Sequence, residues 1–204
     1  MNHTFFELYL IRHGKTKATE KKLYCGNTDL PLSRKGRKEL QKTNKSYPPC
    51  AGYFTSGMRR CNETLEIILG ENLDSVDFTV LPFLKEMNLG VFDMKSYEDL
   101  KTSPEYIRWL SDKSDNLAPP GGESKNMFNR RVSMGLLGLT ERIMRFKLES
   151  AMCITHGGVI AAIMQSLFLK FGGTINLSEW QPEPGKGFKL VHSGEEGYVG
   201  FERL

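Results

Sequence analysis

The chain has 204 residues, of which 39% are hydrophobic and 25% are charged, as in ordinary globular proteins. It holds no apolar run near the roughly 18–20 residues that span a bilayer, and its first residues lack the features of a signal peptide, so we expect a cytoplasmic protein with no membrane partner. Residues 1–62 carry 13 Lys and Arg against 4 Asp and Glu, whereas the remainder carries 15 against 20, which predicts an anionic partner. No recognition motif or aromatic interleaving accompanies the basic residues, so a small phosphorylated or carboxylated ligand fits better than nucleic acid.

The first half of the chain alternates predicted strands and helices. Apolar runs rich in aromatic and branched residues predict the strands, and Ser33 and Ser56 are the predicted helix caps. This alternation is typical of a parallel sheet with helices on both faces. The predicted elements are strands over 5–11, 51–55 and 77–81, helices over 33–44 and 59–69, and a polar loop or broken helix over 17–26.

The second half continues the same pattern and ends in two strands joined by a glycine turn. We find no repeat or linker, so we expect one domain over residues 1–204. Its predicted fold is a three-layer α/β/α sandwich with a mostly parallel central sheet. The predicted elements are an irregular helix over 96–110 interrupted at Pro104, a loop over 112–122, helices over 123–149 and 159–171, and strands over 151–155, 187–192 and 198–202.

Four cysteines are scattered along the chain, and none has the spacing of a metal site or of a CxxC redox motif. We therefore expect reduced thiols, and neither a metal nor a cofactor. Cys25 stands beside Gly26 in a candidate site loop, where it is either a ligand contact or a buried thiol. The cysteines are Cys25, Cys50, Cys61 and Cys153.

Two predicted strands end in nearly the same way. Arg12-His13-Gly14 follows the first strand, and His156-Gly157-Gly158 follows the strand over 151–155. Parallel strands bring such ends to one edge of the sheet, where α/β proteins carry their chemistry. For either histidine alone a structural role is the better interpretation, but two such signatures favour a shared site. We expect His13 to attack a phosphate that Arg12 helps to hold.

These residues belong to an ordered series of motifs that resembles the histidine phosphatase superfamily, also called the phosphoglycerate mutase-like family. Arg-His-Gly alone is a weak signal, but the ordered series is specific and covers nearly the whole chain. The matching segments are Leu10-Ile11-Arg12-His13-Gly14-Lys15-Thr16, Cys25-Gly26-Asn27-Thr28-Asp29-Leu30-Pro31-Leu32 with Gly36, Ser56 through Arg60 to Thr64, Leu84-Lys85-Glu86 with Gly90, Pro120-Gly121-Gly122-Glu123-Ser124, and Thr155-His156-Gly157-Gly158-Val159-Ile160.

The resemblance implies three catalytic residues. Neutral His13 attacks phosphorus in line and forms a phosphohistidine. His156 donates to the equatorial oxygens, and Glu86 protonates the leaving oxygen and later deprotonates the attacking water. Phosphoryl transfer depends mostly on positioning and charge stabilisation, so arginines and a histidine can replace a metal.

The resemblance also implies the groups that bind the phosphate, which needs fixed positive charge because it is dianionic near neutral pH. Arg12 and Arg60 can each donate parallel hydrogen bonds to its oxygens. The family spacing selects Arg60 rather than its neighbour Arg59, which we expect at the rim or in solvent. Further expected contacts come from Thr19, Cys25, Gly26 and the amide of Gly157.

Three departures from the family pattern concern the site. Thr19 stands where an asparagine is common, and its hydroxyl has a shorter reach. Lys15 stands where Glu or Gln is usual, and it either adds charge to the pocket mouth or is a solvated loop lysine. Asp93-Met94 replaces a common Glu-Gly pair in the covering loop.

Three functions fit the motifs: a phosphatase, a phosphoglycerate mutase that keeps its phosphohistidine from water, and a non-catalytic phospho-ligand binder. The segment from 86 to 120 has no room for the insertion that closes mutase sites, and the retained motif residues argue against a binder. We therefore predict a compact phosphatase that acts on a small phosphorylated metabolite. The stretch 24–32 is similar to the α-ribazole phosphatases and to many broad phosphatases, and both a monomer and a homodimer remain open.

Overall fold

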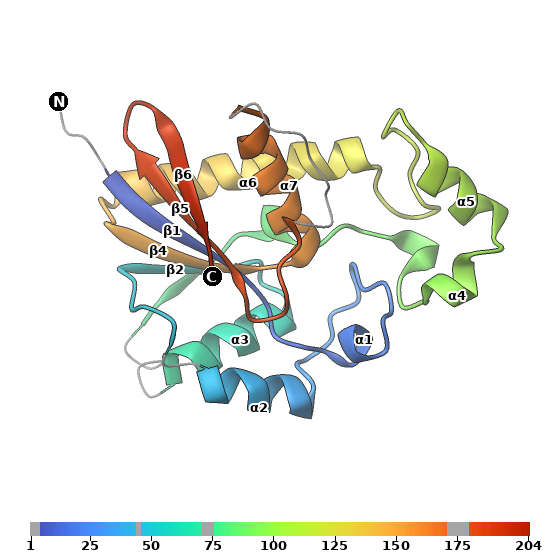
Figure 1. The fold of residues 1–204 in the computed structure, drawn as a ribbon, viewed down its shortest axis with the longest axis horizontal. Helices are drawn as coiled ribbons and strands as arrows, with labels where there is room; N and C mark the ends of the chain where they lie inside the picture. The colour runs from blue at the N-terminus through green and yellow to red at the C-terminus, as the bar shows by residue number, and fades with distance from the viewer. Residues whose placement is uncertain (1–4, 44–45, 71–75, 171–179) are drawn as a thin grey trace.

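The computed structural model describes residues 5–43, 46–70, 76–170 and 180–204, and its strands form one mixed sheet (Figure 1). The strands are β1 (Phe5–Arg12), β2 (Gly52–Thr55), β3 (Phe78–Val80), β4 (Ser150–Thr155), β5 (Gly187–Ser193) and β6 (Gly197–Arg203). Their order in the sheet is β3-β2-β4-β1-β5-β6. The first four strands are parallel, whereas β5 is antiparallel to both of its neighbours. The prediction of a mostly parallel sheet is confirmed.

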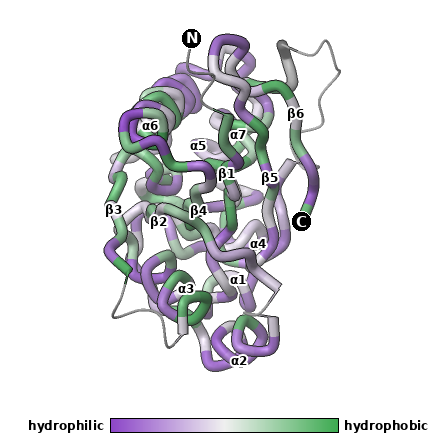
Figure 2. The backbone as a smooth tube through the Cα atoms, turned by 90° about the vertical axis from the view of Figure 1, so that its left-hand side faces the viewer, coloured by the Kyte–Doolittle hydropathy of each residue, from purple (hydrophilic) through white to green (hydrophobic). Residues whose placement is uncertain are grey.

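Helices cover both faces of this sheet, as the two perpendicular views show (Figures 1 and 2). The helices are α1 (Lys17–Glu20), α2 (Arg34–Thr43), α3 (Arg59–Leu69), α4 (Tyr97–Leu100), α5 (Pro104–Ser111), α6 (Lys125–Arg145) and α7 (Gly157–Lys170), with 3-10 turns η3 (Pro82–Leu84) and η4 (Gly90–Phe92). The pair α6 and α7 lies on one face, and α2 and α3 lie on the other. The small helices α4 and α5 lie beyond one end of the strands, at the right of Figure 1. The predicted three-layer arrangement is therefore confirmed.

Alternating residues of β1 divide the hydrophobic core between the two faces. Leu8 and Leu10 are completely buried in the cluster that includes α6 and α7. Tyr9 and Ile11 point to the opposite side, where they pack in the cluster that includes Leu65 of α3. The period of two in strand side chains produces this division. β1 is thus held from both sides, which fixes the backbone that leads to Arg12 and His13.

Several element boundaries differ from the predictions. α6 is shorter than the predicted helix over 123–149, because Ser124 caps its start and the helix ends at Arg145. α7 begins at Gly157, two residues earlier than expected. The basic stretch after Gly14 contains the single-turn helix α1, which a reciprocal pair of threonine caps begins. The predicted interruption at Pro104 is confirmed, since Pro104 starts α5 after the separate helix α4.

The junction of β1 and β4 is the place where the chain can form a crevice. The two strands are adjacent and parallel, and the helices that follow them lie on opposite faces of the sheet. Such a reversal opens a crevice at the carboxyl ends of the strands in α/β folds. In the described part of the chain, no helix has the length and apolar character needed to cross a bilayer.

Candidate active site

The two motif histidines stand at the ends of neighbouring strands. Arg12 is in register with Thr155, and the amide of His13 donates to the Thr155 carbonyl at 2.9 Å. The rings of His13 and His156 consequently lie edge to face, with 5.2 Å between their centroids. The prediction that both strand ends meet at one edge of the sheet is confirmed.

His13 has the bonding pattern of a neutral nucleophile. Its Nδ1 lies 2.7 Å from the carbonyl oxygen of Gly14. Because a carbonyl only accepts, Nδ1 carries the ring hydrogen and the lone pair of Nε2 is free. Burial, together with the positive charge of Arg60, lowers the pKa of His13 well below its ordinary value. The ring is therefore neutral at neutral pH, the form that can attack phosphorus.

Arg12, the neighbour of His13, has a side-chain donor without a partner among the described residues. Its Nη1 donates to the Pro182 carbonyl at 2.8 Å, while its buried Nε has no acceptor among the described residues. Burial lowers the pKa of Arg12, and the nearby carboxylates of Glu86 and Glu183 oppose that shift. A buried N–H without a partner is exceptional in folded proteins. A phosphoryl oxygen is the kind of acceptor that such a guanidinium donor binds.

The Arg60 side chain is more buried than the sequence predicts for a charged residue. It lies at the start of α3 with 1% of its surface exposed. Its Nη1 and Nη2 donate to the carbonyls of Thr28 and Gly26, both at 2.9 Å, and its Nε donates to Nδ1 of His156 at 3.3 Å. In this geometry Arg60 holds the loop over residues 26–28 and supplies fixed positive charge. The neighbouring Arg59 side chain is 61% exposed and pairs with Glu63, in line with its predicted place at the rim.

His156 is completely buried, and both of its ring nitrogens have partners within the protein. Because Nδ1 accepts from Arg60, Nε2 carries the hydrogen, and it lies 2.9 Å from Oγ of Ser56. Burial and the charge of Arg60 lower the pKa of His156 well below its ordinary value. His156 is therefore a neutral ring whose N–H can serve as a donor.

Glu86 is anchored at the edge of the same site by backbone amides. Its Oε2 accepts from the amide of Gly158 at the start of α7, and its Oε1 accepts from the amide of Met87, both at 3.0 Å. A carboxylate at a helix N-terminus also interacts favourably with the helix dipole. A Cβ on Gly158 would lie 2.4 Å from Oε1 of Glu86, so the second glycine of the motif makes room for this carboxylate.

The departure at Asp93-Met94 has a structural explanation. The Asp93 carboxylate accepts from the amide of Gly26 at 2.7 Å and from the amide and hydroxyl of Thr28 at 2.8 and 2.7 Å. Met94 has a φ of 60°, in the left-handed region that favours glycine. Asp93 thus holds one side of the site loop, while Arg60 holds its carbonyls. Both backbone groups of Gly26, predicted as a ligand contact, are used in this way.

A cavity of about 290 Å³ opens at this edge of the sheet. Five predicted site residues line it, whereas Arg60, His156, Gly26 and Gly157 are not among its lining residues. Thr19 lines the cavity, and its hydroxyl accepts from the Thr16 amide at 3.4 Å as part of the α1 cap. The predicted residues in the lining are Arg12, His13, Thr19, Cys25 and Glu86.

A family model described as the histidine phosphatase superfamily (branch 1) matches residues 8–178. The chain belongs to this family. It is 30% identical over 165 residues to the adenosylcobalamin/alpha-ribazole phosphatase of Salmonella typhimurium, a match that covers 78% of each chain. The predicted resemblance is confirmed, and the protein is a hydrolase of the phosphatase class.

Solved structures show the same fold. The alpha-ribazole phosphatase of Shigella flexneri superposes with a TM-score of 0.76 at 23% identity, covering 91% of this chain and 90% of that one. A phosphoglycerate mutase of Thermus thermophilus superposes with a TM-score of 0.69 at 27% identity, covering 98% of this chain and 99% of that one.

The cavity of this histidine phosphatase is also lined by residues that the sequence did not predict as site residues. Gln181 and Arg12 both lie close to Gly157: a Cβ on Gly157 would come within 2.5 Å of the Gln181 amide nitrogen and 3.1 Å of the Arg12 guanidinium carbon. Gln181 has no sequence signal, because it belongs to no motif and reaches the site only through the fold. The other unpredicted lining residues are Thr16, Leu23, Tyr24, Met87, Leu89, Trp109, Phe128 and Gly158.

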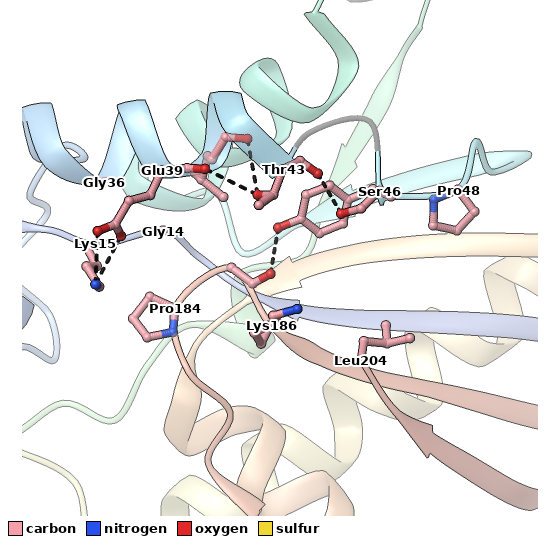
Figure 3. A pocket seen from close by; sticks show the side chains of 13 residues that line it. Gly14, Lys15, Gly36, Glu39, Thr43, Ser46, Pro48, Pro184, Lys186 and Leu204 are labelled. Carbon is pink, nitrogen blue, oxygen red and sulfur yellow. Dashed lines mark hydrogen bonds and ion pairs between the residues drawn. The ribbon is translucent and has the colours of Figure 1, made fainter.

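A second cavity, of about 300 Å³, is lined by Gly14 and Lys15 after β1, by residues of α2 and by residues 184–186 before β5 (Figure 3). Lys15 lines this cavity and pairs with Glu39 at 3.0 Å, which places it outside the lining of the histidine cavity. Several polar groups here bond one another: the Ser46 hydroxyl donates to the Thr43 carbonyl at 2.6 Å, as the dashed lines in Figure 3 mark. None of the predicted site residues lines this second cavity, whereas His13 and Glu86 line the first.

Proposed function

We propose that this histidine phosphatase hydrolyses a small phosphorylated metabolite through a phosphohistidine on His13. The observation that carries the proposal is the hydrogen bond from Nδ1 of His13 to the Gly14 carbonyl, 2.7 Å long, within a cavity that Arg12 and Glu86 also line. This bond leaves Nε2 as the nucleophilic nitrogen of a neutral ring. The free Nε–H of Arg12 supports phosphate binding beside it.

In the proposed first step, Nε2 of His13 forms a bond to phosphorus while the ester P–O bond breaks. Protonated Glu86 gives its proton to the leaving alkoxide, so a free alcohol departs. In the second step Glu86 takes a proton from water, the hydroxide attacks phosphorus, and the N–P bond breaks. Inorganic phosphate leaves and Glu86 is protonated again, so that every proton is accounted for.

Arg60 and His156 support this reaction from below the cavity in our proposal. Arg60 contributes fixed positive charge, which adds to the effect of burial in lowering the pKa of His13 and favours the dianionic phosphate. The N–H of His156 serves an equatorial oxygen when Nε2 exchanges the Ser56 hydroxyl, now 2.9 Å away, for that oxygen. Gly157, whose backbone lies beside Arg12, contributes its amide to the same oxygens.

We further propose α-ribazole phosphate as the first metabolite to test. The support is the name of the Salmonella typhimurium relative, 30% identical to this chain. The segment between Glu86 and Pro120 adds only η4, α4 and α5 over the site. A segment this short has no room for the insertion expected of a mutase, which favours hydrolysis over retention of the phosphoryl group.

The decisive experiment compares the wild type with His13→Ala on p-nitrophenyl phosphate and on α-ribazole phosphate. We expect phosphate release in the presence of EDTA, and a loss of about a thousandfold or more in kcat for His13→Ala. Radiolabelled substrate should leave an acid-labile, base-stable label on the wild type alone. Thermal melting of both proteins controls for folding. Turnover by a folded His13→Ala protein would rule out the phosphohistidine.

The structural likeness to a phosphoglycerate mutase supports one alternative function. A mutase would interconvert 2- and 3-phosphoglycerate faster than it releases phosphate from either. We expect the opposite ratio for this chain. Simultaneous assay of both products on the wild type distinguishes the two functions.

A further inference from the structure

The outward side of α6 carries large apolar side chains that one copy of the chain leaves exposed. The helix lies along one face of the sheet (Figure 1), and residues on its inward side, such as Leu139 and Ile143, are completely buried. A row of exposed apolar side chains on the opposite side of such a helix is typical of a surface that binds a partner. The row consists of Met127, Met134, Leu137 and Met144, with 60%, 54%, 63% and 38% of their surfaces exposed.

Two charged residues, Arg130 and Glu141, complete this row, which we call the outer stripe of α6. Steps of three and four residues alternate along the whole stripe, the spacing that lines up side chains on one side of a helix and that paired helices share. At a rise of 1.5 Å per residue the stripe is about 26 Å long. In chain order it consists of Met127, Arg130, Met134, Leu137, Glu141 and Met144.

The order of residues in the outer stripe is complementary to itself when the helix is reversed. In an antiparallel pair of α6 helices, Met134 lies against Leu137 of the second copy and Arg130 lies against Glu141 of the second copy. Both contacts occur twice by symmetry, and the methionines at the two ends of the stripe meet each other. A parallel pair would instead place like charges together at both charged positions, which is unfavourable.

The two charged residues have no role in the fold of a single copy. Both are exposed, and neither side chain forms a hydrogen bond or an ion pair within the described part of the chain. Opposite charges at the mirrored positions of the stripe are therefore available for a second copy. Their replacement should leave the fold of one copy unchanged.

Gly138 supports a close approach of another helix at the middle of the stripe. It lies one turn after Met134, and a Cβ at this position would meet nothing within 4 Å. Glycine inside a helix is destabilising relative to alanine, and no neighbour in the described structure requires it here. The missing side chain instead leaves room for a partner beside the central Met134 and Leu137.

We propose that α6 docks a second copy of this chain, with the two helices antiparallel and their outer stripes in contact. A membrane surface fits less well, because charged residues interrupt the stripe, whereas a helix that lies on a bilayer keeps its charges on the other face. We expect an interface near the lower end of the roughly 1,200–2,000 Å² of stable complexes, and hence a micromolar Kd. The proposal is independent of the phosphatase reaction, since no outer-stripe residue lines the active-site cavity.

The first test is sedimentation velocity of the wild type between about 1 and 200 µM, where the mass should rise from one chain to two. Leu137→Asp buries a carboxylate against Met134 of the second copy, so we expect it to weaken the dimer about tenfold or more. Leu110→Asp is the matched control, because Leu110 is 50% exposed and lies on α5. This control should dimerise as the wild type does, and circular dichroism should show that both variants are folded.

The second test exchanges the charges. Arg130→Glu and Glu141→Arg each place like charges against one another in a homodimer, so each should weaken the dimer about tenfold or more. An equimolar mixture of these two variants should regain the dimer, because every charged contact between them is again between opposite charges. The double variant Arg130→Glu/Glu141→Arg should dimerise as the wild type does.

A wild type that remains monomeric over this range would overturn the inference, as would a dimer that Leu137→Asp leaves unchanged or a mixture that does not regain the dimer. Binding of a monomeric wild type to phosphatidylglycerol vesicles, lost in Leu137→Asp, would assign the outer stripe to a membrane and also overturn the proposal. Phosphate release from p-nitrophenyl phosphate is measured on the same samples. Its absence from the wild type would refute the proposed function and leave the dimer unaffected.

Discussion

At the scale of single residues, Thr64 connects the two halves of the site. Its hydroxyl oxygen accepts from the amide of Gly14 at 3.0 Å and donates to the carbonyl of Arg60 at 2.7 Å. The Gly14 carbonyl in turn holds Nδ1 of His13. Thr64 touches no reacting atom in this arrangement, so it is a positioning residue for the proposed nucleophile.

The first prediction concerns this hydroxyl. Thr64→Val keeps the volume and removes the acceptor for the Gly14 amide, so the loop that orients His13 loosens. We expect kcat to fall about tenfold with little change in KM. Thr64→Ser, which keeps the hydroxyl, should restore most of kcat. If the valine variant matched the serine variant, the bond to Gly14 would have no part in positioning His13.

At the scale of elements, α6 holds the connector that contains Glu86. Nη1 of Arg131 donates to the carbonyls of Phe83 and Lys85 at 2.8 and 2.9 Å, and Nη2 donates to the carbonyl of Glu86 at 3.3 Å. Arg131 also pairs with the largely buried Glu123. A single side chain thus fixes the backbone on both sides of Glu86, although α6 begins only at Lys125, far along the chain.

The second prediction tests the Arg131 clamp, by which we mean its hydrogen bonds to the backbone carbonyls around Glu86. Arg131→Met breaks the ion pair and leaves three carbonyls without their donor, so we expect a loss of about 2–4 kcal/mol in unfolding free energy. We also expect kcat to fall about tenfold, because Glu86 loses its fixed position. The adjacent and exposed Arg130 supplies the control. Denaturant unfolding and steady-state kinetics should separate Arg131→Met from Arg130→Met, and identical behaviour would refute the clamp.

At the scale of the whole molecule, the fold buries two neutral histidines. Burial and the charge of Arg60 hold the pKa of both His13 and His156 below the unfolded value of about 6.5. Above that pH both states are neutral and the stability is unaffected. As the pH falls below about 6.5, the unfolded chain takes up protons that the folded chain does not, so acid favours unfolding.

The third prediction follows from this loss of stability in acid. The free energy of unfolding should fall on acidification below about pH 6.5, by up to about 1.4 kcal/mol per pH unit for each of the two histidines. His156→Gln should show a shallower slope, whatever its absolute stability. Urea unfolding between about pH 7.5 and pH 5 gives both slopes. Equal slopes in the two proteins would show that His156 takes up its proton as readily when folded as when unfolded.

Much of the fold and half of the site follow from local patterns in the sequence. The alternation of strands and helices, the helix cap at Ser33, and the glycines beside His13 and His156 each depend on residues that are close together in the chain. Their spacing therefore predicts a parallel sheet with two histidines at one edge. Family motifs added Glu86 and Arg60, which composition alone would leave as surface charges.

Only the tertiary structure decided which hydrogen bonds the candidate site residues make. Arg60 donates to the loop over residues 26–28, Arg131 holds the backbone around Glu86, and Trp109 and Gln181 line the cavity without any motif. These contacts join segments that are far apart in the chain, and hydrophobic periodicity carries no information about which distant segments meet. The sequence alone determined that His13 and His156 share an edge of the sheet. The bond from the Gly14 carbonyl, which Thr64 of α3 holds in place, decided which nitrogen of His13 is free, and the packing of α5 and α6 decided which apolar side chains line the cavity.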